Sequence, residues 1–269
     1  MDFRDIIEST DRYNFHTHTQ FCDGRSTVEA MARAAVAGGF IHIGFSPHSP
    51  ISISSPCNMS IEDVPVYKAE VERMRSIYGD SCRFYIGMEI DYLSPQQGPS
   101  AETYKDFNLD YAIGSVHFIR SQEGDFVDVD GRFDAFCQKM ERQFHNDIRY
   151  VVNEFYRASN EMLALGGFDI LGHFDKIAQN ASYYSPGIED EKWYLDIVDD
   201  YVDHIIDAGI VVEINTKARV EHNRFFPNQR YWKRLLDAKV PLLINSDAHY
   251  DDRLDASRKE AFDLLHNLR

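Results

Sequence analysis

The sequence predicts an α/β protein with one domain over residues 1–269, built on a parallel sheet that is open or closed. Seven short apolar segments typical of buried strands alternate with segments typical of amphipathic helices. The length of 269 residues suits a single α/β domain, and no linker, low-complexity tract or internal repeat divides it. With 43% hydrophobic residues, the chain has enough apolar side chains for a sizeable core.

The predicted strands are short and rich in Ile, Val, Phe and Tyr, as strands buried on both faces are. In chain order they are Tyr13–Thr17, Ile41–Ser46, Arg83–Ile90, Tyr111–Val116, Asp169–Gly172, Ile210–Ile214 and Leu242–Ile244. Two stretches that follow strands, Pro47–Pro65 and Arg120–Gly131, are irregular and are predicted to be functional loops.

Helices are predicted between the strands. The first begins at the capping-box pattern of residues 26–29 and ends at Gly38–Gly39. A helix from about Val66 ends at Gly79, and a long one spans roughly Ala135–Leu165. Between Trp193 and Ala208 apolar residues recur at i and i+4, which indicates one buried helix face that ends at Gly209. The last helix covers about Ala256–Leu268.

Charge and composition exclude several classes of protein. The formal net charge is −16, which repels nucleic-acid phosphates at long range but still permits a local cationic pocket. The longest apolar run, near Ala34–Ile41, is far shorter than the ~20 residues of a membrane helix, and the N-terminus has no apolar signal core. The four cysteines are too sparse for a disulfide scaffold. A cytoplasmic protein without nucleic-acid or membrane partners is therefore expected.

Residues that can bind metals recur where the predicted strands end. They are His16 and His18 with nearby Asp23, then His48, Glu89, His117, His173, and finally Asp247 and His249. In a parallel barrel all strand ends meet at one face, so these groups would surround one small space. Imidazole and carboxylate suit Zn, Mn or Fe, and the absence of cysteine pairs argues against a structural zinc. A lone His is usually a core or loop residue, as His145, His204, His222 and His266 could be.

This ordered set resembles the PHP (polymerase and histidinol phosphatase) superfamily over nearly the whole chain, most closely its monofunctional histidinol-phosphatase branch. The resemblance implies a distorted (β/α)7 barrel with three divalent metal ions. It places His16, His18, Glu89 and Asp247 on one ion, a shared Glu89 with His117 and His173 on a second, and Asp23, His48 and His249 on a third. Many superfamily members have His where this chain has Asp23, but a carboxylate is also a competent ligand.

The resemblance also implies a reaction, the hydrolysis of L-histidinol phosphate in histidine biosynthesis by attack of a metal-bridging hydroxide on phosphorus. Asp247 or His249 is a candidate to assist the leaving alkoxide. Lys176 and Arg219, on loops after predicted strands, are expected phosphate contacts or else solvated cations. Glu213 could bind the substrate's ammonium group or form a structural hydrogen bond, and His42 could contact substrate or lie in the core.

Two alternatives stay open at this point. Another small phosphate ester such as a nucleotide could be the substrate, with Tyr183–Tyr184 or Phe225–Phe226 stacking on a base. A non-catalytic module that keeps its metals for structure or sensing is disfavoured by the intact ligand set. The sequence does not predict the oligomeric state.

Overall fold

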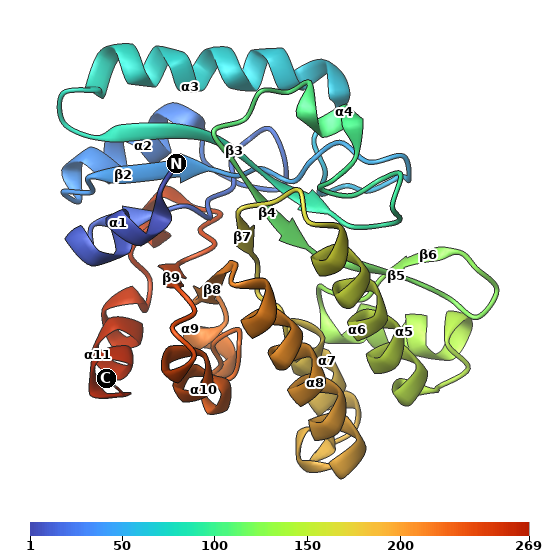
Figure 1. Ribbon diagram of the computed structural model, residues 1–269. Helices are drawn as coiled ribbons and strands as arrows, with labels where there is room; N and C mark the ends of the chain where they lie inside the picture. Colours follow the sequence, from blue (N-terminus) through green and yellow to red (C-terminus); the bar gives the residue numbers. More distant parts are fainter. Residues whose placement is uncertain (269) are drawn as a thin grey trace.

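The protein's structure, a computed structural model that describes residues 1–268, is built around a seven-stranded parallel sheet curled into a nearly closed barrel (Figure 1). The strands follow one another around the barrel in chain order. They are β1 (Tyr13–Asn14), β2 (His42–Phe45), β3 (Arg83–Asp91), β4 (Tyr111–Ser115), β7 (Ile170–Leu171), β8 (Val211–Asn215) and β9 (Leu242–Asn245). The predicted (β/α)7 barrel is confirmed. Four of its strands, β1, β2, β4 and β7, are one to three residues shorter than predicted, β3 and β9 are one residue longer, and β8 is shifted by one residue.

The seam between β1 and β9 is closed without a continuous strand ladder. Thr17 and Ala248, just beyond these strands, form a parallel bridge, and the His18 amide donates to the Ala248 carbonyl at 2.8 Å. The Asn245 side-chain oxygen accepts from the Phe15 amide at 2.8 Å. These bonds hold the segments after β1 and β9 side by side, which brings the first and last predicted ligand pairs together.

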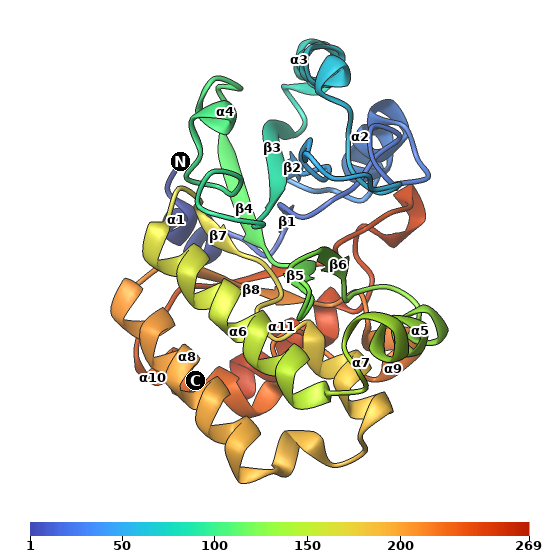
Figure 2. The same cartoon turned by 90° about the vertical axis from the view of Figure 1, so that its right-hand side faces the viewer.

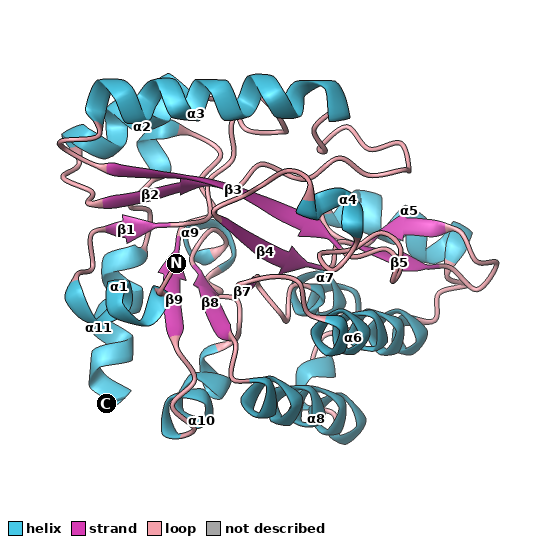
Figure 3. Ribbon diagram, turned by 45° about the horizontal axis from the view of Figure 1, so that its top comes forward, coloured by secondary structure: helices cyan, strands magenta, loops and turns pink. Residues whose placement is uncertain are grey.

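Helices surround the barrel (Figures 2 and 3). The α-helices are α1 (Phe3–Ser9), α2 (Val28–Ala37), α3 (Val64–Tyr78), α4 (Glu102–Lys105), α5 (Phe133–Gln143), α6 (Ile148–Leu165), α7 (Ile177–Tyr184), α8 (Lys192–Ala208), α9 (Arg219–His222), α10 (Trp232–Asp237) and α11 (Arg258–Leu268). Short 3-10 turns occupy η1 (Ile61–Asp63), η2 (Ile188–Asp190), η3 (Gln229–Tyr231) and η4 (Asp251–Arg253).

Two helix predictions need correction. The first cap is Thr27, whose side chain accepts from the Ala30 amide at 3.1 Å, so the helix begins one residue later than the capping-box pattern suggests. The single helix expected over 135–165 is two helices. His145 and Asn146 adopt positive φ angles of 48° and 58° between α5 and α6, and the Asp147 side chain then caps α6. A left-handed pair interrupts any α-helix.

The segment 120–131, predicted to be an irregular loop, instead contains most of an antiparallel hairpin. β5 (Phe118–Arg120) pairs with β6 (Phe126–Asp128), and the hairpin extends beyond the end of β4 (Figure 1). Strands of three residues are too short to give a recognisable periodicity, which explains the wrong prediction. The other irregular stretch, 47–65, holds only η1 and the start of α3, as expected for a loop.

Within residues 1–268, no helix is both long and apolar enough to cross a membrane. All four cysteines are free, as the sequence predicts. The boundary of a single domain at 1–269 stays a prediction.

Candidate metal centre

All nine predicted metal ligands lie together at the carboxyl ends of the barrel strands. Overlapping groups of three offer ligand atoms that lie within 4.8 Å of one another: His16, His18 and Glu89; His16, His173 and Asp247; His18, Asp23 and His48; His18, Asp247 and His249; and His48, Glu89 and His117. The strand-end pattern therefore correctly predicts that these nine side chains meet at one face, and their role as metal ligands stays a prediction.

Glu89 occupies the middle of the cluster. Its side chain is 1% exposed, and its two oxygens face different imidazoles. Oε2 lies 3.1 Å from His16 Nε2 and 3.4 Å from His18 Nε2. Oε1 lies 2.8 Å from His173 Nε2 and 3.6 Å from His117 Nε2. One carboxylate thus faces two separate sets of nitrogen ligands, as a group that bridges two cations must.

The remaining predicted ligands lie next to the residues that face Glu89. Asp247 Oδ1 lies 3.1 Å from His18 Nε2, on the side of the Glu89 Oε2 set. Asp23 Oδ1 lies 3.2 Å from His249 Nε2 and 3.9 Å from His48 Nε2, which forms a third set at the edge of the cluster. The geometry is compatible with the three ligand sets implied by the sequence.

Three buried side-chain atoms in the cluster have no hydrogen-bond partner among the described residues, and they indicate whether cations fit between the ligands. His16 Nε2, Asp23 Oδ1 and His48 Nδ1 are buried and have no hydrogen-bond partner. A buried polar atom without a partner costs about 1–3 kcal/mol, so such atoms are normally satisfied by something. Because the other nitrogen of His16 is already bonded to Glu213, its Nε2 is free to bind a cation. These residues fit divalent metal ions with nitrogen and oxygen ligands.

A second layer of hydrogen bonds orients the ligands. Glu213 accepts from His16 Nδ1 at 2.7 Å, and Asp91 accepts from His117 Nδ1 at 2.6 Å. Carboxylates that bond the outer nitrogen of a ligating imidazole fix its tautomer and raise its basicity. The sequence analysis did not assign Asp91 any role, although its position two residues after Glu89 on the same strand face was visible.

The expectation that Glu213 could bind a substrate ammonium group is not supported. Glu213 is fully buried, and four protein groups already bond its oxygens. Oε1 accepts from His16 Nδ1 and from Asn245 Nδ2 at 3.0 Å, and Oε2 accepts from the His173 amide at 3.0 Å and Asn215 Nδ2 at 3.1 Å. Glu213 instead forms structural hydrogen bonds, which is the alternative role that the sequence analysis gave for it.

A cavity of about 280 Å³ opens onto the cluster. Two lysines line it, Lys176 after β7 and Lys217 after β8, together with the loop 54–58 and the hairpin residues Asp128 and Asp130. Lys176 was predicted to lie at the site. Lys217 was missed, although it follows β8 by two residues and the strand-end rule could have found it.

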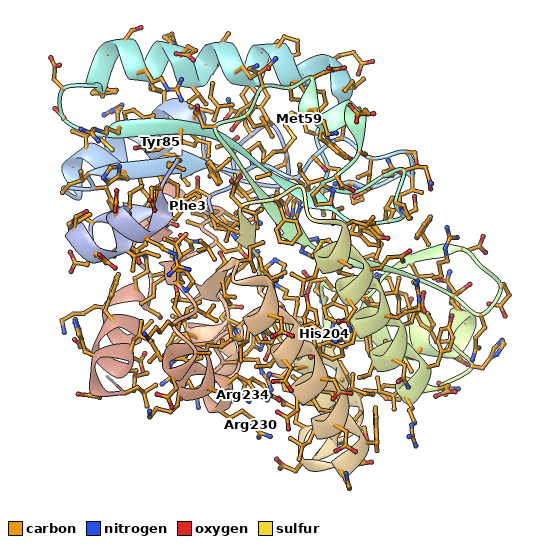
Figure 4. The ribbon with its side chains drawn as sticks, viewed as in Figure 1. Phe3, Met59, Tyr85, His204, Arg230 and Arg234 are labelled. Atoms are coloured by element: carbon orange, nitrogen blue, oxygen red, sulfur yellow. The ribbon has the colours of Figure 1, made fainter. Side chains whose placement is uncertain are left out.

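His42 and Arg219 do not line this cavity. His42 is the first residue of β2, at the opposite end of the barrel, and bonds the Tyr85 hydroxyl at 2.9 Å. Figure 4 labels Tyr85 on the side away from the β5–β6 hairpin. Arg219 is held by Glu260, with Nη2 2.5 Å from Oε1. We therefore assign neither residue a substrate contact.

The carboxylates change the titration of the ligands. Burial lowers the pKa of His117, but Asp91 and Glu89 outweigh burial and raise that pKa to about 9. Burial likewise lowers the pKa of His16, while Glu213 and Glu89 lead the carboxylates that bring it well above its usual value. Without a bound cation, these carboxylates therefore favour the charged, doubly protonated form of both imidazoles.

The fold and the site define a metal-binding α/β barrel, with its ligands supplied by successive strand ends. The chain belongs to the PHP domain family, which matches residues 14–217.

Among its relatives, a Schizosaccharomyces pombe protein inferred to be a histidinol-phosphatase is 24% identical over 251 residues, 87% of this chain and 79% of that protein. A Listeria monocytogenes structure proposed to be a histidinol phosphatase superposes with a TM-score of 0.81 at 17% identity, covering 92% of this chain and 99% of that one. Histidinol phosphate phosphatase from Lactococcus lactis, solved with zinc, L-histidinol and phosphate, gives a TM-score of 0.71 at 20% identity and covers 96% and 94%.

Glu89→Gln is expected to weaken the binding of two ions at once, because the amide loses the charge that faces both ligand sets. Loss of an outer partner weakens metal binding by about 10- to 100-fold, and loss of this bridging charge should exceed that range. Elemental analysis after dialysis measures the ions retained per chain. Glu70→Gln, on the exposed face of α3, is the matched control. Retention of the wild-type metal content by Glu89→Gln would contradict the bridging role.

Metal binding is expected to release protons and to tighten as pH rises towards about 9. Below that pH the raised pKa of His117 keeps a proton on the ring, which competes with the cation, and the competition disappears as the ring deprotonates. Calorimetric titration of Zn²⁺ into metal-free protein, in buffers of different ionisation enthalpy, measures both effects. An affinity that does not change with pH between about 6.5 and 9 would rule this out.

Proposed function

We propose that this protein hydrolyses L-histidinol phosphate to L-histidinol and phosphate. The observation that carries the proposal is the cavity, which is lined by seven of the nine clustered candidate metal ligands together with Lys176 and Lys217. A phosphate monoester carries negative charge that both metal ions and lysine ammonium groups attract. The relatives named as histidinol-phosphatases, and the Lactococcus lactis structure with L-histidinol and phosphate, favour this monoester over others.

Three divalent ions are the proposed cofactors. His16, His18, Glu89 and Asp247 would hold the first, while Glu89, His117 and His173 would hold the second. Asp23, His48 and His249 would hold the third. Zinc is supported by the Lactococcus lactis relative, and Mn or Fe would suit the same nitrogen and oxygen donors. When bound, such ions lower the pKa of a water to about 7 and neutralise charge on the phosphoryl oxygens.

The two lysines bind and orient the phosphoryl group. Lys176 is largely buried, and its Nζ lies 3.5 Å from Asp130 Oδ2. Lys217 Nζ lies 3.3 Å from Asp247 Oδ1 and 3.2 Å from His249 Nε2. Their ammonium groups approach the cavity from neighbouring strands, so they can hold a phosphate dianion between them.

The leaving alkoxide needs a proton, and the sequence proposed Asp247 or His249 to assist it. Burial alone would raise the pKa of Asp247, but Lys217, His16 and His18 bring it well below the usual value. Asp247 therefore stays ionised and suits a metal ligand. His249 is likewise a proposed metal ligand, so the proton is assigned to the Lys217 ammonium, which lines the cavity and lies 3.2 Å from His249 Nε2.

Nucleotide substrates are less well supported. Phe225 and Phe226 are 2% and 0% exposed, so neither presents a face to a base. Tyr183 and Tyr184 do not line the cavity, whose lining includes a single aromatic ring other than histidine, Phe118.

Lys176→Met is expected to lower kcat/KM by about 10- to 100-fold for both L-histidinol phosphate and 4-nitrophenyl phosphate, because both substrates present the same phosphate to the lysine. Phosphate release by the metal-loaded enzyme measures the effect, and Lys192→Met on the surface of α8 is the control. A loss confined to one substrate would remove Lys176 from phosphate binding. A wild-type enzyme that prefers nucleotides to L-histidinol phosphate would overturn the proposed function.

A further inference from the structure

L-Histidinol phosphate carries a cationic amino group beside its phosphate ester, so a selective site needs an acceptor for positive charge as well as for negative charge. Glu213 cannot supply that acceptor, because it is buried and fully bonded. The cavity lining itself offers the other carboxylates. Among the described residues they are Asp23, Glu89, Asp91, Asp128, Asp130 and Asp247.

Most of these carboxylates already have a function. Asp23, Glu89 and Asp247 belong to the proposed ligand sets. Asp91 accepts from His117 Nδ1 with one oxygen and from Asn58 Nδ2, at 2.8 Å, with the other. The carboxylates left to face the substrate are the two on the hairpin.

The hairpin is built to present these two side chains. Residues 127 and 129 are both valines, 5% and 2% exposed, and they pack into the core. Strand alternation therefore turns Asp128 and Asp130 to the opposite face, where both line the cavity. The Val129 amide donates to the His117 carbonyl at 2.9 Å, which fixes the hairpin against a proposed metal ligand.

The two carboxylates differ in their surroundings. Asp130 contacts Lys176, and this lysine leads the groups that outweigh burial and lower the pKa of Asp130. Asp128 accepts from Lys139 Nζ of α5 with Oδ2 and from the Asp130 amide with Oδ1, each at 2.8 Å. Unlike Asp91, whose side chain is 1% exposed, Asp128 keeps 42% of its side chain exposed, so its oxygens can still accept from a ligand in the cavity. Burial, followed by the charge of Asp130, nevertheless raises the pKa of Asp128. The ammonium group of Lys139 therefore does not fully compensate the negative charge of Asp128.

We propose that Asp128 binds the ammonium group of the cationic amino alcohol while Lys176 and Lys217 hold its phosphate. Asp130 supports both functions, since it positions Lys176 and adds negative charge beside Asp128. The site thus separates the charges of its substrate, with lysines for the anion and the hairpin for the cation. This inference rests on the proposed function, and it assigns the substrate selectivity of the same cavity.

Asp128→Asn tests the inference through ligand binding rather than turnover. The metal-loaded enzyme, saturated with inorganic phosphate, is titrated calorimetrically with L-histidinol and with 3-(imidazol-4-yl)propan-1-ol, which lacks the amino group. Wild type should prefer L-histidinol. Asp128→Asn should weaken L-histidinol binding by about 10- to 100-fold and leave the amine-free alcohol and phosphate nearly unchanged.

Two controls separate the carboxylate from its surroundings. Asp125→Asn makes the same chemical change on the exposed turn of the hairpin, outside the cavity lining, and should retain the wild-type preference. Lys139→Met removes the partner of Asp128 but keeps the carboxylate, so it should not weaken L-histidinol binding. If Lys139→Met reproduces the loss seen in Asp128→Asn, the effect is structural and the inference is wrong.

The outcomes also separate this inference from the proposed function. An enzyme that hydrolyses L-histidinol phosphate, but whose preference for L-histidinol survives Asp128→Asn, would overturn the role of Asp128 and leave the function standing. A wild-type enzyme that hydrolyses other monoesters and not L-histidinol phosphate would overturn both.

Discussion

The structure depends on a single buried carboxylate. Glu89 is 1% exposed, and five imidazoles approach its oxygens within 3.6 Å. Burying an ionised carboxylate costs several kcal/mol unless strong partners compensate it. Without metal, the raised pKa values of His16 and His117 let these rings supply part of that compensation, and cations between the oxygens and the rings would supply it directly. The barrel must hold the ends of several strands within a few ångströms of Glu89, and that requirement explains why β1 and β9 are joined at the seam.

Two further layers of polar residues surround the proposed metal centre. Glu213 and Asp91 fix the imidazoles nearest to Glu89, and their own remaining oxygens are bonded by asparagines. Beyond them, Lys176 and Lys217 place positive charge at the cavity wall. A protein with a net charge of −16 can bind an anion at this face because the attraction is local and acts at short range. The hairpin carboxylates Asp128 and Asp130 add negative charge to the same cavity wall, beside Lys176.

Local patterns predicted a parallel sheet, open or closed, and placed nine candidate ligands at its strand ends, where a parallel barrel brings them together. The closed (β/α)7 barrel was implied by the family resemblance. Patterns could not decide which way a carboxylate points, so Glu213 appeared available although the interior asparagines bond it. The ion pair of Arg219 joins residues 41 positions apart, which no local signal reveals. The hairpin that carries Asp128 was missed because its strands are three residues long, and several short helices, α4 and α9 among them, were missed for the same reason.

Anomalous X-ray scattering from crystals of the zinc-loaded protein tests the central role of Glu89 most directly. The account predicts one zinc peak on each side of the carboxylate, with its two oxygens each about 2.0–2.2 Å from a different ion. The first ion should also contact His16 and His18, and the second His117 and His173. Zinc bound only at the outer residues, with none beside Glu89, would contradict the account.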